Sequence, residues 1–516
     1  MVTEKDSWLR REKFEWNEFF ILFIIGLIAN IYFVTTFSPS IDDELAAIRD
    51  VRTVWIAQGR FTVFLVESLL FPQPSTAYSP YLFMAAVLAV SYMLLVRIHN
   101  WQPAWKSYAA YALFATYPSW WLISEFSANV PSTALGFLCV SGALYLHARR
   151  TARRRLGRAA AIMLLLTIAA GAYQSLLLVF ISGTIGLLLV QSLQSNSRFQ
   201  YRKAFEDLAH SVLCLIGGTV LYFVLNKLMQ AAFHAPPEYI ASFFRPENML
   251  HAPLWLTASI VKQAAQTYSG SAAIFGASMP CAALSVAGAL LCLAAASRKT
   301  VLLPNLVLFG VLLASPFLFL FLTGPGEFPL RAMLALPYAV WLCAMLILTC
   351  PAGLLRHAGL VVLGLFQLQV VNVTSQYIAT ATMAQNQDRA MGFAIGSKIL
   401  ELQDSTDKGA PILLDVYGHT ERERPSLYAS ADTSVTRGSF FGWDQGNLQR
   451  ITGYLRVIGF DSIRGVPAAQ RAALTAQFQQ MPTWPHPGSV QKSGQVYLLK
   501  LGASADKAHN GSESAK

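Results

Sequence analysis

The chain has 516 residues, of which 54% are hydrophobic and 13% are charged, and its mean hydropathy is +0.44. This composition excludes an ordinary soluble protein and predicts that most of the chain lies in a lipid bilayer. The net charge of +11 does not indicate nucleic acid as a partner, because many basic residues lie in short loops between apolar runs, where they orient a membrane protein. The six cysteines lie in or beside apolar runs, so no disulfide framework is expected.

Apolar runs long enough to cross the hydrocarbon as helices recur through the first three quarters of the chain. The polar start leads into the first run without an obvious cleavage site, which favours an uncleaved first span. Run length therefore predicts a polytopic α-helical membrane protein with about eleven spans. The predicted spans are residues 19–37, 80–96, 107–123, 130–148, 159–172, 174–190, 208–229, 272–296, 301–322, 332–349 and 358–374.

The apolar run 159–191 is too long for one span and short for two. Basic loops precede it at 149–158 and follow it at 198–203, and basic loops favour the cytoplasmic side. The chain must therefore cross an even number of times between them, as two short helices or as a re-entrant pair broken near 171–174. This rule puts the N-terminus in the cytoplasm. It makes residues 38–79, 230–271 and 323–331 periplasmic loops.

After residue 374 the chain becomes polar and mixed, and its length suffices for a small domain. We therefore divide it into a transmembrane domain (1–375), a periplasmic α/β domain (376–501) and a disordered tail (502–516). Apolar spacing predicts the elements of the periplasmic domain. They are helices at 381–403, 443–459 and 467–481 and strands at 411–417 and 495–501.

The first periplasmic loop begins with "FSPSIDDELAAIRD", in which Asp42, Asp43 and Glu44 are adjacent. One interpretation is a helix start, because Ser40 with Asp43 resembles a capping box and acids in a first turn complement the helix dipole. A cap needs one or two carboxylates, and three adjacent ones repel each other. The other interpretation is a catalytic cluster, with Ser40 and Asp43 shaping the helix and Asp42 or Glu44 acting as general base. No cofactor follows from the sequence, although a divalent cation could bind these acids together with a substrate phosphate.

Basic residues in two periplasmic loops are candidates for phosphate binding. Residues 45–72 mix apolar and basic side chains, which predicts a helix lying in the membrane interface, with Arg60 facing lipid phosphates or the phosphate of a bound donor. In "GPGEFPLR", Glu327 and Arg331 could form a weak turn salt bridge. Alternatively, Arg331 stabilises a departing lipid phosphate.

"GAYQS" puts Tyr173 and Gln174 at the expected helix break. These side chains either satisfy the broken backbone or bind a sugar through an aromatic face and an amide. The nine histidines show no metal-ligand spacing, so no metal site is assigned to them.

Several stretches together resemble one family. "SPSIDDELAAIRD", "GAYQSLL", "GEFPLR", "QNQDRA" and "SFFGWDQGNLQRI" are similar to the Gtr-type (type II) O-antigen glucosyltransferases, which are membrane glycosyltransferases of the GT-C superfamily. The resemblance implies a bacterial inner-membrane enzyme that moves glucose from a polyprenyl-phosphate donor to lipopolysaccharide or another surface polysaccharide on the periplasmic face. It also implies that Asp42, Asp43 and Glu44 carry catalysis. Lys500 in "YLLKLG" is the nearest match to a lysine of the family pattern.

The implied mechanism is inverting. The acceptor hydroxyl gives its proton to one of the acids while it attacks the anomeric carbon, and Arg331 or Arg60 neutralises the departing phosphate. A polysaccharide polymerase with a lipid-diphosphate donor is an alternative. A lipid or polysaccharide transporter is another, but it should show ionisable residues in mid-span and paired half-repeats, and the sequence has no strong case of either.

Overall fold

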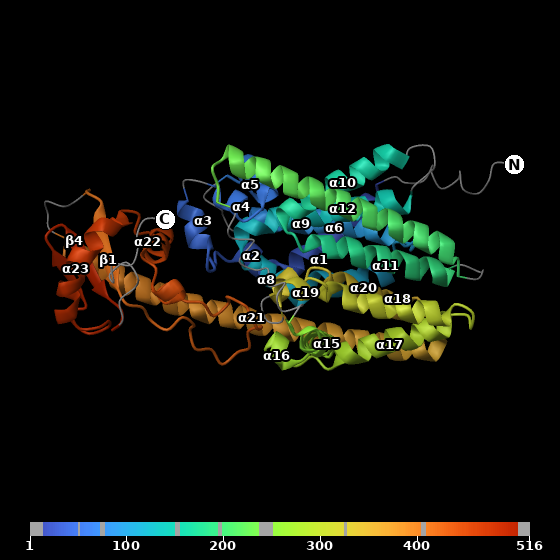
Figure 1. The fold of residues 1–516 in the computed structure, drawn as a ribbon. Coiled ribbons are helices and arrows are strands. Elements are labelled where there is room, and N and C mark those ends of the chain that lie inside the picture. The colour runs from blue at the N-terminus through green and yellow to red at the C-terminus, as the bar shows by residue number, and fades with distance from the viewer. Residues whose placement is uncertain are drawn as a thin grey trace.

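A computed structural model describes residues 14–49, 52–72, 78–149, 155–194, 199–236, 251–324, 328–403 and 409–503. Figure 1 shows an elongated bundle of helices and, at one end of it, a smaller unit that contains the strands. The long helix α21 (Gly353–Glu401) runs along the bundle and reaches that unit.

The bundle begins with helices of very different lengths. They are α1 (Trp16–Ala29), α2 (Ile31–Thr35), α3 (Asp43–Ile48), α4 (Val54–Ala57), α5 (Phe61–Leu69), α6 (Ser79–Ile98), α7 (Trp105–Thr116), α8 (Pro118–Ser124), η2 (Ser127–Asn129), α9 (Val130–Ala148), α10 (Arg155–Ala172), α11 (Leu176–Gln194) and α12 (Tyr201–Ala232). Its second half precedes α21. The elements there are α15 (Pro253–Tyr268), α16 (Ala272–Phe275), α17 (Cys281–Ala296), α18 (Leu302–Ala314), η4 (Ser315–Phe317), α19 (Leu320–Thr323), η5 (Leu330–Ala332) and α20 (Leu336–Leu348).

The helices have the composition of a membrane protein. Within the described ranges, five helices are long and apolar enough to cross a bilayer, and five more are apolar but shorter. Some predicted spans are broken, since Pro118 starts a new helix at α8 and Gly276 takes a left-handed conformation after α16. The count of about eleven spans stays a prediction.

The break expected within the run 159–191 is present. Helix α10 ends at Ala172 and α11 begins at Leu176, which leaves Tyr173, Gln174 and Ser175 in the turn between them.

The segment 45–72 differs from the predicted single interfacial helix. It forms three short helices, α3, α4 and α5, and the chain turns sharply at Gly59, where φ is +69°. Phe61 and Val63 of α5 are buried. A Cβ at Gly171 of α10 would lie 2.5 Å from the Phe61 ring, so α5 packs closely against the bundle instead of lying only on lipid.

The C-terminal unit contains a four-stranded sheet in the order β2-β1-β4-β3. The strands predicted at 411–417 and 495–501 correspond to β1 and β4, which pair in parallel. Helix α21 crosses the predicted domain division after residue 375 without interruption, and that division stays a prediction. Of the predicted tail, residues 504–516 lie outside the described residues. The elements are β1 (Ile412–Tyr417), η7 (Trp443–Gln445), α22 (Leu448–Val457), β2 (Ile463–Gly465), α23 (Ala468–Gln480), β3 (Val490–Ser493) and β4 (Val496–Lys500).

The acidic loop is packed against the C-terminal unit. Ile41 is buried in the hydrophobic core of that unit, together with Phe440 and Phe441. Gly438 permits this approach, because a Cβ there would lie 2.6 Å from the Ile41 side chain. The start of α3 is therefore held between the bundle and the C-terminal unit.

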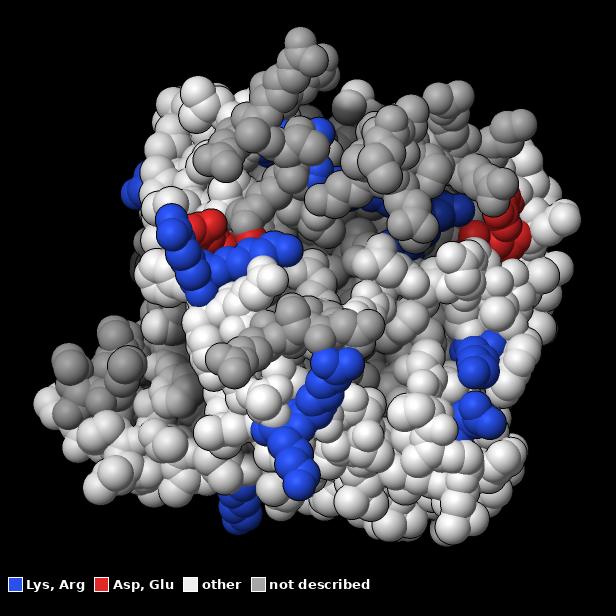
Figure 2. Space-filling model, turned by 90° about the vertical axis from the view of Figure 1, so that its right-hand side faces the viewer, with Lys and Arg blue, Asp and Glu red and all other residues white. Residues whose placement is uncertain are grey.

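Figure 2 shows the opposite end of the molecule. Lys and Arg side chains are spread over this face, whereas Asp and Glu are confined to small areas of it. At this end α6 finishes, α10 and α12 begin, and α21 begins, so the basic loops counted in the sequence gather on one end of the bundle.

Candidate functional site

The three adjacent acids of the first loop do not face a common point. Asp42 precedes α3 with a left-handed backbone (φ +84°), a conformation that is uncommon for residues other than glycine. Its carboxylate and that of Glu44 both bind Arg450, whereas Asp43 points to another partner. The triplet is thus divided between two environments.

Arg450 of α22 binds the first environment. Its guanidinium donates to Asp42 at 2.8 Å, to Asp444 at 2.6 Å and to the fully buried Glu44. Burial alone lowers the pKa of Arg450, but the carboxylates of Glu44 and Asp42 outweigh it, so the pKa is raised and the side chain stays charged. Gly453, one turn further along, lets α22 approach the backbone of Glu44, to which a Cβ there would come within 3.3 Å.

Asp43 occupies the second environment. Its Oδ1 accepts hydrogen bonds from the backbone N–H of Ser127 at 3.0 Å and from the Ser127 hydroxyl at 2.7 Å. Its Oδ2 accepts from the N–H of Ser40 at 3.0 Å, which is one half of the expected capping box. Within the described part of the chain, Asp43 forms no ion pair. Burial therefore raises the pKa of the Asp43 carboxyl to about 7.

Asp43 also faces open space. It lines a cavity together with Phe33, Tyr81 and Ser127. A carboxylate of near-neutral pKa on a cavity wall is what a general base requires.

The residues predicted to bind donor phosphate and sugar lie together. The Arg60 guanidinium stacks on the ring of Tyr173, 4.8 Å from its centroid, and donates to Asn129 Oδ1 at 3.3 Å. Gln174 donates to the carbonyls of Gln58 and Gly59 at 3.3 and 3.4 Å. Gln174 thus satisfies carbonyls at the turn after α4 and not backbone at the α10–α11 break, and its role in sugar binding stays a prediction.

The turn η2 connects Asp43 with the group formed by Arg60 and Tyr173. Its first residue, Ser127, binds Asp43, and its last residue, Asn129, binds Arg60. The acid of the first loop and the predicted phosphate-binding arginine are therefore fixed to opposite ends of a three-residue turn.

The other predicted residues lie elsewhere. Arg331 donates to the Thr433 carbonyl at 2.8 Å and stacks on Phe126 at 5.0 Å. Lys500 lies in β4 and donates to the Met481 carbonyl at 2.8 Å. The label of β4 is on the side of the C-terminal unit away from α3 (Figure 1). Glu327 lies outside the described residues.

The acids do not form a three-carboxylate metal site. Arg450 binds Asp42 and Glu44, and Asp43 faces Ser127. Across the described ranges, no group of three His, Cys, Asp or Glu side chains is arranged to hold a metal ion.

Sequence reasoning missed three residues of this arrangement. Ser127 and Asn129 lie in an unremarkable connection between helices, and no motif marks them. Arg450 lies within "SFFGWDQGNLQRI", a stretch that carried the family resemblance, but its pairing with the first loop cannot be read from spacing.

Comparison with known proteins gives one match. The family model for the glucosyl transferase GtrII matches residues 31–348, which include the acidic loop, η2 and the α10–α11 turn. No curated protein and no solved structure matches the chain.

Proposed function

The chain belongs to the GtrII glucosyl transferase family and is therefore a glycosyltransferase, from which we propose that it moves glucose from a polyprenyl-phosphate donor to an O-antigen polysaccharide with Asp43 as general base. The observation that carries the proposal is the arrangement around η2. A carboxyl with a pKa near 7 and an arginine suited to phosphate lie at the two ends of one short turn.

Asp43 suits the role of base better than its two neighbours do. Arg450 binds the carboxylates of Asp42 and Glu44, and neither side chain borders the cavity that Asp43 lines. Burial raises the pKa of Glu44 to about 8, but its carboxyl is fully buried and does not reach that cavity. Among the described residues, the donors to Asp43 are neutral, and Asp43 borders a cavity. Asp43 is therefore proposed as the base in place of Asp42 or Glu44, which the sequence favoured.

The reaction is a single displacement at the anomeric carbon of the donor. Asp43 takes the proton of the acceptor hydroxyl, whose oxygen forms the new bond to that carbon. The bond from the carbon to the phosphate oxygen breaks, and its electron pair leaves with the polyprenyl phosphate. One displacement inverts the configuration of the glucose.

Arg60 is the group best suited to the departing phosphate. Its Nε is buried and has no hydrogen-bond partner within the described residues, so the guanidinium retains an unused donor. Its stacking on Tyr173 fixes its position while that donor remains available. Arg331 is less suited, because a backbone carbonyl already binds it.

We also propose that the acids and the C-terminal unit are periplasmic. The support is charge, because the opposite end of the bundle carries the basic loops (Figure 2), and such loops favour the cytoplasm. Glucosyl transfer to a finished surface polysaccharide requires a periplasmic site. In a bacterium with two membranes, such a helical protein would lie in the inner one.

The test is transfer of radiolabelled glucose from synthetic polyprenyl-phosphate glucose to O-antigen polysaccharide by the purified full chain. The variant Asp43→Asn should lower the rate at least about 100-fold, because general bases contribute on that scale. Asp42→Asn, with the same chemical change on the neighbouring residue, should lose much less. Equal losses in the two variants, or an active Asp43→Asn, would exclude Asp43 as the base.

A further inference from the structure

A second cavity lies beside the one that Asp43 lines. It is bordered by α2, α8, α21 and the loop before α22. Phe33, Ser38 and Pro39 border both cavities, so only the segment around Pro39 separates the second cavity from the site of transfer. A ligand that occupies the second cavity therefore lies next to the reacting atoms.

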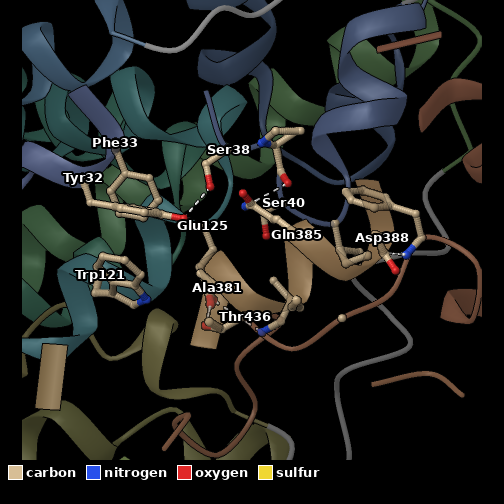
Figure 3. A pocket seen from close by; sticks show the side chains of 16 residues that line it. Tyr32, Phe33, Ser38, Ser40, Trp121, Glu125, Ala381, Gln385, Asp388 and Thr436 are labelled. Atoms are coloured by element: carbon tan, nitrogen blue, oxygen red, sulfur yellow. Dashed lines mark hydrogen bonds between the residues drawn. The ribbon is translucent and has the colours of Figure 1, made fainter. Parts of the chain in front are cut away.

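The walls of this cavity have the chemistry of a saccharide site. Figure 3 shows aromatic side chains, Tyr32 and Trp121, on one side, and the polar side chains Gln385 and Asp388 on the other. The rings of Phe33 and Trp121 are 4.6 Å apart, which makes one continuous aromatic surface. Sugars bind through their C–H faces to such surfaces and through their hydroxyls to convergent polar groups.

One donor on the wall lacks a partner. Trp121 is only 5% exposed, and its buried indole Nε1 forms no hydrogen bond in the described part of the chain. In Figure 3 this nitrogen lies on the side of the ring that faces the cavity. Buried indole N–H groups normally find an acceptor, so a ligand oxygen in the cavity would satisfy this one.

The charge of the cavity walls indicates which of the two substrates, the acceptor or the donor, the cavity would bind. Among the described residues, those that border the cavity include Glu125 and Asp388 but no lysine, arginine or histidine, and Asp388 is itself paired with Arg424 outside the lining. Such walls disfavour a phosphate and accept a neutral sugar. The basic group suited to phosphate, Arg60, is instead bound to the far end of η2 from Asp43.

We propose that this cavity binds neutral sugar units of the acceptor polysaccharide next to the hydroxyl that is glucosylated, with Trp121 as a determinant of acceptor binding. The inference rests on the proposed function for the identity of the polysaccharide. Binding itself requires neither donor nor chemistry, so it can be measured separately.

The experiment compares two tryptophans. Trp121→Phe removes the unpaired donor from the cavity wall. Trp120→Phe removes an indole N–H that is also buried and also has no hydrogen-bond partner among the described residues, but Trp120 does not border the cavity. Binding of O-antigen polysaccharide, released from its lipid by mild acid, is measured by calorimetry on the full chain without donor. Trp121→Phe should weaken binding about 3- to 10-fold, the effect of one hydrogen bond, and Trp120→Phe should leave it unchanged.

A second variant guards against a folding defect in Trp121→Phe. Ala384 of α21 is buried and borders the cavity, so Ala384→Leu fills space there without touching Asp43. This variant should abolish measurable binding and raise the KM for the polysaccharide, with the KM for the donor unchanged. Wild-type binding in both Trp121→Phe and Ala384→Leu would overturn the inference, as would displacement of the polysaccharide by polyprenyl phosphate.

The outcomes separate the two proposals. If binding depends on Trp121 but no glucose is transferred, the saccharide site stands and the proposed function fails. If transfer is normal and the KM for the polysaccharide does not change in Trp121→Phe and Ala384→Leu, the proposed function stands and the saccharide site fails.

Discussion

Arg450 and Glu44 form a buried ion pair although 406 positions separate them in the sequence. Glu44 belongs to the loop that follows the first two helices, and Arg450 belongs to the C-terminal unit. The same guanidinium binds Asp42, whose left-handed backbone begins α3. The C-terminal unit therefore holds the turn that carries Asp43, and a strained residue at that turn is maintained by the surrounding contacts.

The first prediction concerns this ion pair. Arg450→Met would leave the Glu44 carboxyl buried without its partner, and removal of one member of a buried pair costs about 3 kcal/mol or more. We expect a lower unfolding temperature, measured on the purified chain in detergent, and a lower transfer rate because the start of α3 loses its support. Arg464→Met, which changes an exposed arginine of β2, is the matched control. An unfolding temperature unchanged in Arg450→Met would show that the pair does not stabilise the loop.

The sequence predicted the local parts of this arrangement. Apolar runs predicted helices, short apolar segments predicted β1 and β4, and the "GAYQS" turn was expected at the break between α10 and α11. These features follow from residues that are close in the chain. The role of Asp43 did not follow, because its environment depends on Ser127 and on the position of Arg450. Spacing predicts which side chains share a helix face, but it does not predict which distant residue supplies a counter-charge.

The single interfacial helix was wrong for a related reason. One of the two interpretations of the arginines in residues 45–72 was contact with lipid phosphates, but Arg49 stacks on Trp55 at 4.9 Å, and Arg60 stacks on Tyr173. The close contact of Phe61 with Gly171 shows that the segment packs against protein. Composition alone does not distinguish packing against protein from contact with lipid.

The second prediction concerns the pH dependence of transfer. Because burial raises the pKa of Asp43 to about 7, the base is protonated and inactive below that pH. The value of kcat/KM should rise about tenfold per pH unit below pH 7 and level off above it. Asp42→Asn should keep the same midpoint. A profile that is flat from about pH 5.5 to 8.5 would contradict the assignment of Asp43.

The third prediction concerns the pH dependence of stability. The pKa of Asp43 is raised in the folded protein from 3.8 to about 7, so the folded state binds a proton that the unfolded state has lost between these values. The stability that comes from this proton is fully present below pH 3.8 and is lost as the pH rises through about 7. The unfolding temperature of the wild type should therefore decline from about pH 5 to pH 8, and the decline should be smaller in Asp43→Asn. Equal slopes in the two proteins would show that Asp43 titrates normally.

The last prediction separates donor binding from catalysis by the acid. Arg60→Gln keeps a polar side chain but removes the charge that faces the donor phosphate, and a hydrogen bond to a charged group contributes about 1.5 to 3 kcal/mol. The KM for polyprenyl-phosphate glucose should rise on the order of 10- to 100-fold, while the affinity for the polysaccharide stays unchanged. Arg52→Gln, made in the same loop on an arginine that forms no ion pair among the described residues, is the control.

Two results would contradict a phosphate role for Arg60. One is a loss of activity in Arg60→Gln that Arg52→Gln shares, since that would indicate a general effect of charge in the loop. The other is a weaker affinity for the polysaccharide with an unchanged KM for the donor, since that would put the acceptor beside Tyr173. Arg60→Lys tests the geometry further, because lysine keeps the charge but loses the planar group that stacks on Tyr173. Its KM for the donor should lie between those of the wild type and Arg60→Gln.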